Sequence, residues 1–197
     1  PSTSYSLRFR SLYFNNMLEL QYSQVGPEFY SLANPYLPKN VREISFTDKI
    51  WLLNKQLLTT FSYKYKTDDI LETNTNPYNE TNIGINLNYV TGVQSPSVMY
   101  GHNSISRKNS IIEEENIDMR VNFVTKNNLF NFNVPFHKEK ISYWIGGTYN
   151  SIISKDHLSA SRSEDFLSQN SNIQFSSIIL GAHYKKGLKM SVNLSNF

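Results

Sequence analysis

The sequence predicts an all-β fold, an antiparallel up-and-down transmembrane β-barrel, with residues 1–197 forming a single β-barrel domain or barrel segment. Three observations support this prediction. Polar and apolar residues alternate along many segments, several segments reach the roughly 9–11 residues that a tilted strand needs to cross a bilayer, and short and long connections follow one another in turn. We expect about ten strands and an incomplete barrel.

The alternation is clearest in the run TNIGINLNYV. Ile83, Ile85 and Leu87 fall on one face of the predicted strand, whereas Asn82 and Asn86 fall on the other. A period of two marks a strand whose faces meet two different environments. The same pattern predicts strands near 4–13, 17–25, 42–53, 56–67, 80–90, 96–104, 114–137, 140–153, 172–185 and 188–197.

The seventh predicted strand contains a change of parity. Apolar residues occupy odd positions at Val121 and Phe123 but even positions at Phe130 and Phe132. One extra residue in a strand turns every later side chain to the opposite face. We therefore expect one long strand with a bulge at Asn127-Asn128, and a hairpin at the same place is the alternative.

The connections between the predicted strands alternate in length. Short turns are expected at 14–16, 53–56, 91–96, 138–139 and 185–187, and long polar loops at 26–41, 68–79, 105–113 and 154–171. Outer-membrane barrels have short periplasmic turns and longer external loops. On this basis the first strand begins and the last strand ends outside, and we expect an internal piece of a larger barrel or a barrel lacking strands at both ends.

The composition agrees with a barrel that encloses water. Charged residues make up 18% of the chain, below the usual 25% or so of globular domains, and Asn and Ser supply the polarity instead. Tyrosines recur near the ends of predicted strands, at Tyr5, Tyr22, Tyr65, Tyr89, Tyr100, Tyr149 and Tyr184. Aromatic girdles at both membrane interfaces are typical of such barrels.

Several classes of protein are disfavoured. The net charge of +3 comes from scattered residues, which does not indicate nucleic-acid binding. The chain has no cysteine, which excludes disulfides and thiolate chemistry. No stretch is apolar enough for a signal peptide or a membrane helix.

A soluble β-sandwich with a lectin-like binding role is the alternative fold and function, because its strands alternate as well. Asp48 is a contrary residue for the barrel, and either it lies above the membrane or the predicted local register is wrong. This residue shares parity with Ile44, Phe46 and Ile50, so its carboxylate would face lipid. A charge near the bilayer midplane costs on the order of a few kcal/mol.

One part of the chain resembles a known group of proteins. The run Gln24–Tyr36, the predicted strand Ile44–Leu53, a Lys-containing turn and the strand Leu57–Tyr65 look like a recurrent unit of large, mostly uncharacterised bacterial outer-membrane β-barrel proteins. The segments that end in Ser104 and Phe197 are similar to strand ends of that family. The resemblance implies the fold and a location in the bacterial outer membrane, and it implies no catalytic residues.

No residue pattern points to catalysis, a metal or a cofactor. The four histidines have no short metal-binding spacing, and no nucleotide-binding or nucleophile motif is present. We therefore expect a pore, a transporter wall or a receptor scaffold rather than an enzyme, with outer-membrane lipid and an unknown solute or protein as partners and no nucleic acid.

The candidate functional residues are polar side chains that would face the lumen. A tight turn at 14–16 would set Arg10 opposite Glu19 and Arg8 opposite Gln21, where such pairs stabilise the strand register. The full set of candidate lumen residues is Arg8, Arg10, Glu19, Gln21, Lys64, Asn86, Asn88 and Arg120.

Overall fold

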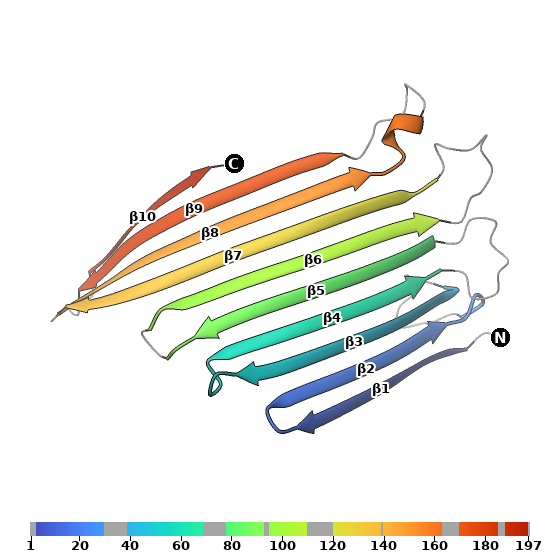
Figure 1. The fold of residues 1–197 in the computed structure, drawn as a ribbon, viewed down its shortest axis with the longest axis horizontal. Helices are drawn as coiled ribbons and strands as arrows, with labels where there is room; N and C mark the ends of the chain where they lie inside the picture. The colour runs from blue at the N-terminus through green and yellow to red at the C-terminus, as the bar shows by residue number, and fades with distance from the viewer. Residues whose placement is uncertain are drawn as a thin grey trace.

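The computed structural model describes residues 3–29, 39–68, 78–92, 95–109, 120–138, 140–162, 170–184 and 188–196. These residues form an all-β fold with one short 3₁₀ helix, Ser159–Ser161, after β8 (Figure 1). The strands are β1 (Ser4–Tyr13), β2 (Asn16–Val25), β3 (Val41–Leu52), β4 (Leu57–Thr67), β5 (Tyr78–Val90), β6 (Ser97–Asn109), β7 (Asn122–Lys138), β8 (Ile141–Asp156), β9 (Ser171–Tyr184) and β10 (Lys189–Asn196).

The strands form one sheet in which each pairs antiparallel with the next along the chain, in the order β1 to β10. The predicted up-and-down all-β fold is thus confirmed, and most strand ends fall within a few residues of their predicted positions. The main differences are at β7, which begins at Asn122 rather than near residue 114, and at β6, which continues to Asn109 rather than stopping near Ser104. The continuation follows from pairing, because β6 stays hydrogen-bonded to β5 and β7 beyond Ser104.

The two kinds of connection lie at opposite ends of the sheet (Figure 1). The short connections β1–β2, β3–β4, β5–β6, β7–β8 and β9–β10 lie at one end, which we call the turn end. The longer connections β2–β3, β4–β5, β6–β7 and β8–β9 lie at the other, which we call the loop end. Most residues of the predicted long loops lie outside the described residues.

The tight turns use backbone conformations that few residues adopt easily. Phe14, between β1 and β2, has a φ of 49°, and Leu53, Asn54 and Lys55, between β3 and β4, have φ values of 50°, 54° and 68°. The left-handed region is sterically costly for residues with a Cβ, least so for Asn. Two-residue hairpins of this hand match the twist of the flanking strands, which explains why the chain adopts it at Phe14.

The predicted bulge at Asn127-Asn128 is wrong. Both residues pair in unbroken register with β6 on one side and with β8 on the other, so β7 is one regular strand. Val121, the odd-numbered apolar residue that suggested the parity change, precedes the strand, and Phe123 lies at its very beginning. The change of pattern therefore belongs to the loop end of the sheet, where the polarity of the two faces changes without any slip of register.

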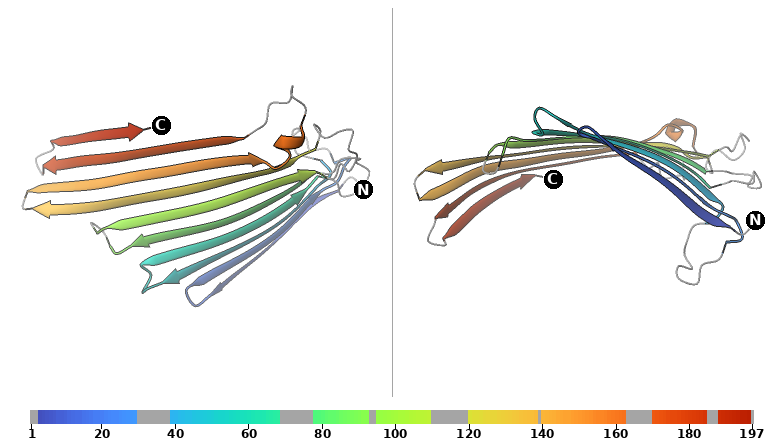
Figure 2. Two further views of the ribbon diagram at one scale, coloured as in Figure 1. Left: turned by 45° about the horizontal axis from the view of Figure 1, so that its top comes forward. Right: turned by 90° about the horizontal axis from the view of Figure 1, so that it is seen from below.

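The sheet is a single curved layer (Figure 2). Among the described residues, no hydrophobic residue is buried, so there is no dry core on either face. The sheet is also open, because β1 and β10 are its outer strands and are not paired with each other. In the same residues, no helix is long and apolar enough to cross a membrane.

Candidate functional site

The register divides the sheet into two chemically different faces. Residues directly opposite each other in an antiparallel pair point to the same side. Following the pairs across the sheet gives an apolar face that includes Leu7, Leu20, Phe46, Tyr63 and Ile83 in successive strands. The residues between them in each strand form the opposite, polar face.

The apolar face is exposed over its whole width. Its side chains include Leu7, Phe9, Ile85, Ile178 and Leu194, of which Leu7 and Leu194 are 67% and 66% exposed. Most of the exposed large apolar side chains of the described residues belong to this face. A monomeric soluble protein rarely leaves so large a continuous apolar surface uncovered.

Tyrosines border this apolar surface, which we call the apolar belt. Towards the loop end, Tyr100 and Tyr149 are its last aromatic residues on β6 and β8, and both belong to the apolar face. The other tyrosines named in the sequence prediction, Tyr5, Tyr22, Tyr65, Tyr89 and Tyr184, also lie on the apolar face. The predicted recurrence near strand ends therefore corresponds to one side of the sheet.

A row of polar side chains follows the belt on the loop-end side of β6 to β9. His102 is opposite Asn128, Asn128 is opposite Ser151, and Ser151 is opposite Gln174. His102 Nδ1 and Asn128 Oδ1 share a hydrogen bond of 2.7 Å. Lys126, one pair further towards the loop end, continues the polar character.

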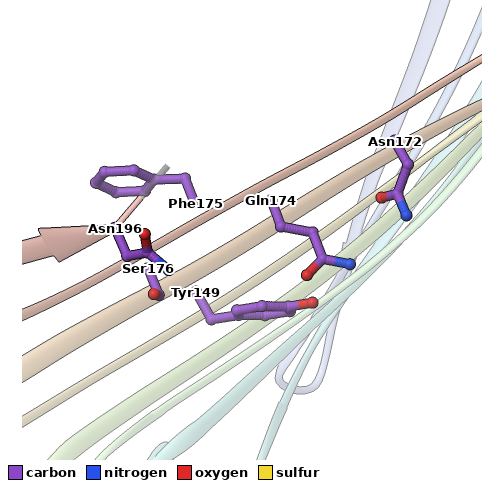
Figure 3. Close-up of a pocket in the computed structure, with 6 residues that line it drawn as sticks. All are labelled: Tyr149, Asn172, Gln174, Phe175, Ser176 and Asn196. Atoms are coloured by element: carbon purple, nitrogen blue, oxygen red, sulfur yellow. The ribbon is translucent and has the colours of Figure 1, made fainter.

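A depression of about 400 Å³ lies at this border on β8, β9 and β10 (Figure 3). Tyr149, Gln174 and Ser176 line it from the apolar face. Its other lining residues are Asn172, Phe175 and Asn196. The largely polar lining marks the place where the apolar belt ends.

Opposite this polar border, the other face becomes apolar. Ile152 is opposite Ile173, and Phe175 is opposite Asn150, all on what is elsewhere the polar face. Phe123, near the start of β7, lies on the same side. Near the loop end of β7 to β9 the polar face thus gains apolar side chains, and the apolar face becomes mostly polar, with Ile153 as an apolar exception.

Asp48 lies on the apolar face, as its parity predicts. It is opposite Leu18 on β2 and Phe61 on β4. Its Oδ1 atom is shielded from solvent and has no hydrogen-bond partner among the described residues. The apolar belt therefore contains a carboxylate group with one shielded oxygen atom that lacks a hydrogen-bond partner.

The polar face carries ion pairs between neighbouring strands. Arg10 donates two hydrogen bonds, of 3.0 and 2.7 Å, to Glu19 Oε2, and Arg8 donates one of 3.1 Å to Gln21 Oε1. The pairing Arg10–Glu19 and Arg8–Gln21 is the one that the turn at 14–16 predicts. Lys64 Nζ lies 2.8 Å from Glu43 Oε2.

The remaining predicted lumen residues lie in two places. Asn86 and Asn88 are on the polar face of β5, opposite Thr60 and Leu58 of β4. Arg120 is outside the strands, since β7 begins at Asn122 rather than near residue 114. It lies at the loop end beside a small cavity of about 110 Å³.

Asparagine side chains continue across the polar face in the middle of the sheet. We call this set the amide band, and it comprises Asn82, Asn86, Asn88, Asn103, Asn127, Asn131, Asn133 and Asn150. The Oδ1 atoms of Asn127 and Asn150 are shielded and accept no hydrogen bond from a described residue. Period-two parity in the sequence would have found most of these residues beyond Asn86 and Asn88.

A hollow of about 430 Å³ opens on the polar face at one side of the amide band. Gly84 and Gly101, both buried, lie in adjacent strands here. A Cβ on Gly84 would stand 2.6 Å from Ser62 Oγ, and one on Gly101 would stand 2.8 Å from Asn86 Oδ1. Because the two glycines have no side chains, Ser62 Oγ can lie above Gly84 and Asn86 Oδ1 can lie above Gly101.

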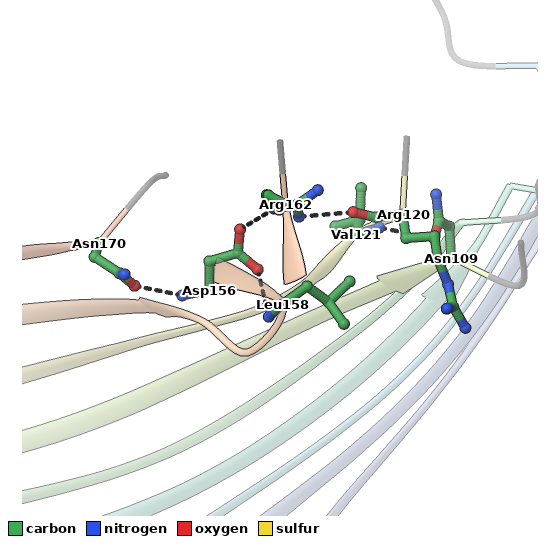
Figure 4. Close-up of polar contacts among 7 residues, drawn as sticks. All are labelled: Asn109, Arg120, Val121, Asp156, Leu158, Arg162 and Asn170. Carbon is green, nitrogen blue, oxygen red and sulfur yellow. Dashed lines mark hydrogen bonds and ion pairs between the residues drawn. The ribbon is translucent and has the colours of Figure 1, made fainter. Parts of the chain in front are cut away.

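A buried ion pair joins the end of β8 and the β8–β9 connection to the β6–β7 connection at the loop end (Figure 4). Arg162 Nε donates to Asp156 Oδ2, and their side chains are only 6% and 3% exposed. Arg162 also donates to the carbonyl oxygen of Arg120 at 2.8 Å, and the Leu158 N–H donates to Asp156 Oδ1 at 2.9 Å. The Asp156 N–H donates to Asn170 Oδ1 at 2.8 Å.

Two opposing effects act on the carboxyl group of Asp156. Burial raises its pKa, but the hydrogen bonds from Arg162 and from the Leu158 N–H, together with the positive charge of Arg162, lower the pKa below its ordinary value. Asp156 is therefore ionised at neutral pH. No signal in the sequence predicted this pair, because its members contact each other only once β8 and the following chain are folded.

The described residues contain no group of three or more histidine, aspartate or glutamate side chains that could hold a metal ion. Comparison with protein-family models, with curated proteins and with solved structures finds no match to this chain. The two faces of the sheet, one apolar and one polar, are the main chemical feature of the described residues.

Proposed function

We propose that this chain forms part of the wall of a transmembrane β-barrel in a bacterial outer membrane, as a pore, a transporter wall or a receptor scaffold without catalytic activity. The observation that carries the proposal is the exposed apolar belt on one face of a single-layered sheet whose other face is polar. In a barrel wall, lipid would cover the apolar belt and water would fill the space next to the polar face.

The size of the belt favours lipid as its covering. On β4 the apolar face is apolar or aromatic from Leu57 to Tyr65 apart from Thr59, and on β8 it runs from Ile141 to Tyr149. At about 3.3 Å per residue, each stretch rises roughly 26 Å along the strand. A tilt of about 35–45° reduces this height to roughly 20 Å, close to the ~25 Å apolar band of known barrels.

The change in polarity of the apolar face near the loop end also favours a lipid bilayer as its environment. Beyond Tyr100 and Tyr149, the apolar face becomes polar at His102 and Ser151. A strand that projects from a bilayer meets water on its outer side, which accounts for such a change. From β4 to β9, the loop-end border of the apolar belt moves towards the turn end when it is followed along rows of paired residues. Such a shift is expected for strands that are tilted relative to the membrane normal.

Covering the apolar belt contributes a large free energy, because the belt contains many large apolar side chains. Transferring one large apolar side chain out of water contributes about 1.5–3 kcal/mol. Because this face carries such residues in every strand, a sheet left uncovered in water would lack most of the apolar burial that normally offsets the conformational entropy lost on folding.

The test is to fold the purified chain in detergent micelles and in plain buffer. A barrel wall predicts β-type circular dichroism and heat-dependent migration in gels only when detergent or lipid is present. A monodisperse β-protein in plain buffer would overturn the proposal and favour the soluble sandwich.

A further inference from the structure

The hollow on the polar face gathers neutral hydrogen-bonding groups from four adjacent strands. Thr47, Ser62, Gly84 and Asn103 form one row of directly paired residues across β3 to β6. The hydroxyl of Ser62 and the amide of Asn103 approach the space above Gly84 from its two sides, at 2.6 and 3.4 Å from where a Cβ would stand. The other polar side chains in the lining are Ser45, Lys64, Asn82 and Asn86.

The chemistry of this lining suits an uncharged solute with many hydroxyl groups. Serine and threonine hydroxyls and asparagine amides each offer both donors and acceptors. The one charged group, Lys64, is already paired with Glu43 at 2.8 Å. An anionic solute would need an uncompensated cation in the lining, and this pair does not supply one.

The abundance of asparagine in these strands needs a reason of its own. Asparagine is among the residues depleted in β-strands, where β-branched and aromatic residues are preferred. The amide band nevertheless extends from the hollow to Asn127, which is directly opposite Asn103, and on to Asn150. The Oδ1 atoms of Asn127 and Asn150 accept no hydrogen bond from the described residues. Rotation of either of these two amides can present its oxygen to a hydroxyl donor.

We propose that the hollow over Gly84 and the part of the amide band next to it, Asn82, Asn86, Asn103 and Asn127, form a binding site for an uncharged polyhydroxylated solute, of the chemical class of sugars. The site deepens the proposed function and rests on it, because it identifies the solute that the water-facing side of the wall binds. Hydroxyl groups of the solute would form hydrogen bonds with Ser62, Asn86 and Asn103. The ring of the solute would lie in the hollow, at the position that Gly84 leaves without a side chain.

The experiment measures sugar binding to the full chain folded in detergent micelles, by saturation-transfer difference NMR. The probes are neutral di- and trisaccharides built from glucose, galactose, mannose and N-acetylglucosamine, with citrate as an anionic comparison. Gly84→Val fills the hollow. Gly146→Val is the matched control, since it is on the same face but a Cβ there meets only ordinary contacts, at 3.5 and 3.7 Å.

We expect at least one neutral saccharide to bind, Gly84→Val to abolish its binding, and Gly146→Val to leave it unchanged. Asn103→Leu keeps the size of the side chain and removes one or two hydrogen bonds, so binding should weaken about tenfold. This variant keeps the proposal testable if Gly84→Val does not fold.

The proposal would be overturned by binding of no saccharide to the folded chain, or by equal binding to Gly84→Val and Gly146→Val. Stronger binding of citrate than of every saccharide would also overturn it and indicate an anion site. A detergent-dependent β-protein that binds no sugar would leave the barrel wall intact, whereas a chain that folds in plain buffer would defeat the barrel wall itself.

Discussion

Replacement of Ile85 by lysine tests whether lipid covers the apolar face. Ile85 lies near the middle of the belt on its own strand, between Ile83 and Leu87, and is directly opposite Phe61 on β4 and the border residue His102 on β6. A lysine at the bilayer midplane of a barrel costs about 2–4 kcal/mol. Because 1.4 kcal/mol is a factor of ten, the equilibrium constant for unfolding should rise roughly 30-fold to several hundred-fold.

The matched control is Asn86→Lys, which changes the next residue on the same strand but faces the polar side. We expect this variant to unfold like the parent. A third variant, Tyr65→Lys, lies at the border of the belt, where the cost falls to about 0–1 kcal/mol. This decrease towards the border is a property of a bilayer and not of a packed protein core.

The assay is denaturant unfolding of the chain in phospholipid vesicles, followed by the fluorescence of Trp51 and Trp144. The reasoning is refuted if Ile85→Lys and Asn86→Lys shift the midpoint equally. It is also refuted if Tyr65→Lys costs as much as Ile85→Lys, because the covering would then have the same polarity throughout.

Three further predictions concern single residues. Asp48→Leu should stabilise the chain in vesicles by about 1–2 kcal/mol, since it removes an unpaired carboxylate from the apolar belt, and an unchanged unfolding midpoint would contradict this. Arg162→Met should leave the buried Asp156 without its ion-pair partner and lower the free energy of local unfolding at the loop end by up to about 3 kcal/mol. In the parent, the pKa of Asp156 is lowered, so the stabilisation by this pair is present at neutral pH and is lost as the pH falls below the ordinary pKa of 3.8. The rate of hydrogen exchange of the Leu158 amide should rise both in the variant and at low pH. Gly181→Ala should displace the indole of Trp144, because the new Cβ would overlap its Cζ2 atom, and should lower the free energy of unfolding by about 1–3 kcal/mol. An unshifted Trp144 emission in a Trp51→Phe background would contradict this displacement.

The sequence predicted the strands well because alternation is a local property. In β5, each residue from Asn82 to Tyr89 reports its own environment, and a period of two needs no knowledge of distant parts of the chain. The pairing of Arg10 with Glu19 was predictable for the same reason. A tight turn sets the register of its two strands, and all the residues concerned lie close together in the sequence.

The prediction failed where one strand passes through two environments. At Phe123 and Phe130 the apolar residues change parity, and a bulge was the simplest local explanation. In the folded sheet the register is continuous, and Phe123 faces the side that becomes apolar near the loop end. Which environment surrounds each part of a strand depends on its neighbours, so the sequence of β7 alone could not distinguish a slip from a change of surroundings.

The sequence by itself determined the all-β class, most strand positions, the register of β1 with β2 and the division into an apolar and a polar face, because these follow from side-chain periodicity and short turns. Only the tertiary structure decided what lies side by side across the sheet. It aligned Gly84 with Ser62 and Asn103 to form the hollow, and it brought Arg162 against Asp156 and the carbonyl of Arg120. These contacts join residues of different strands and connections, and their geometry is set by the cumulative register of the sheet, which no single segment encodes.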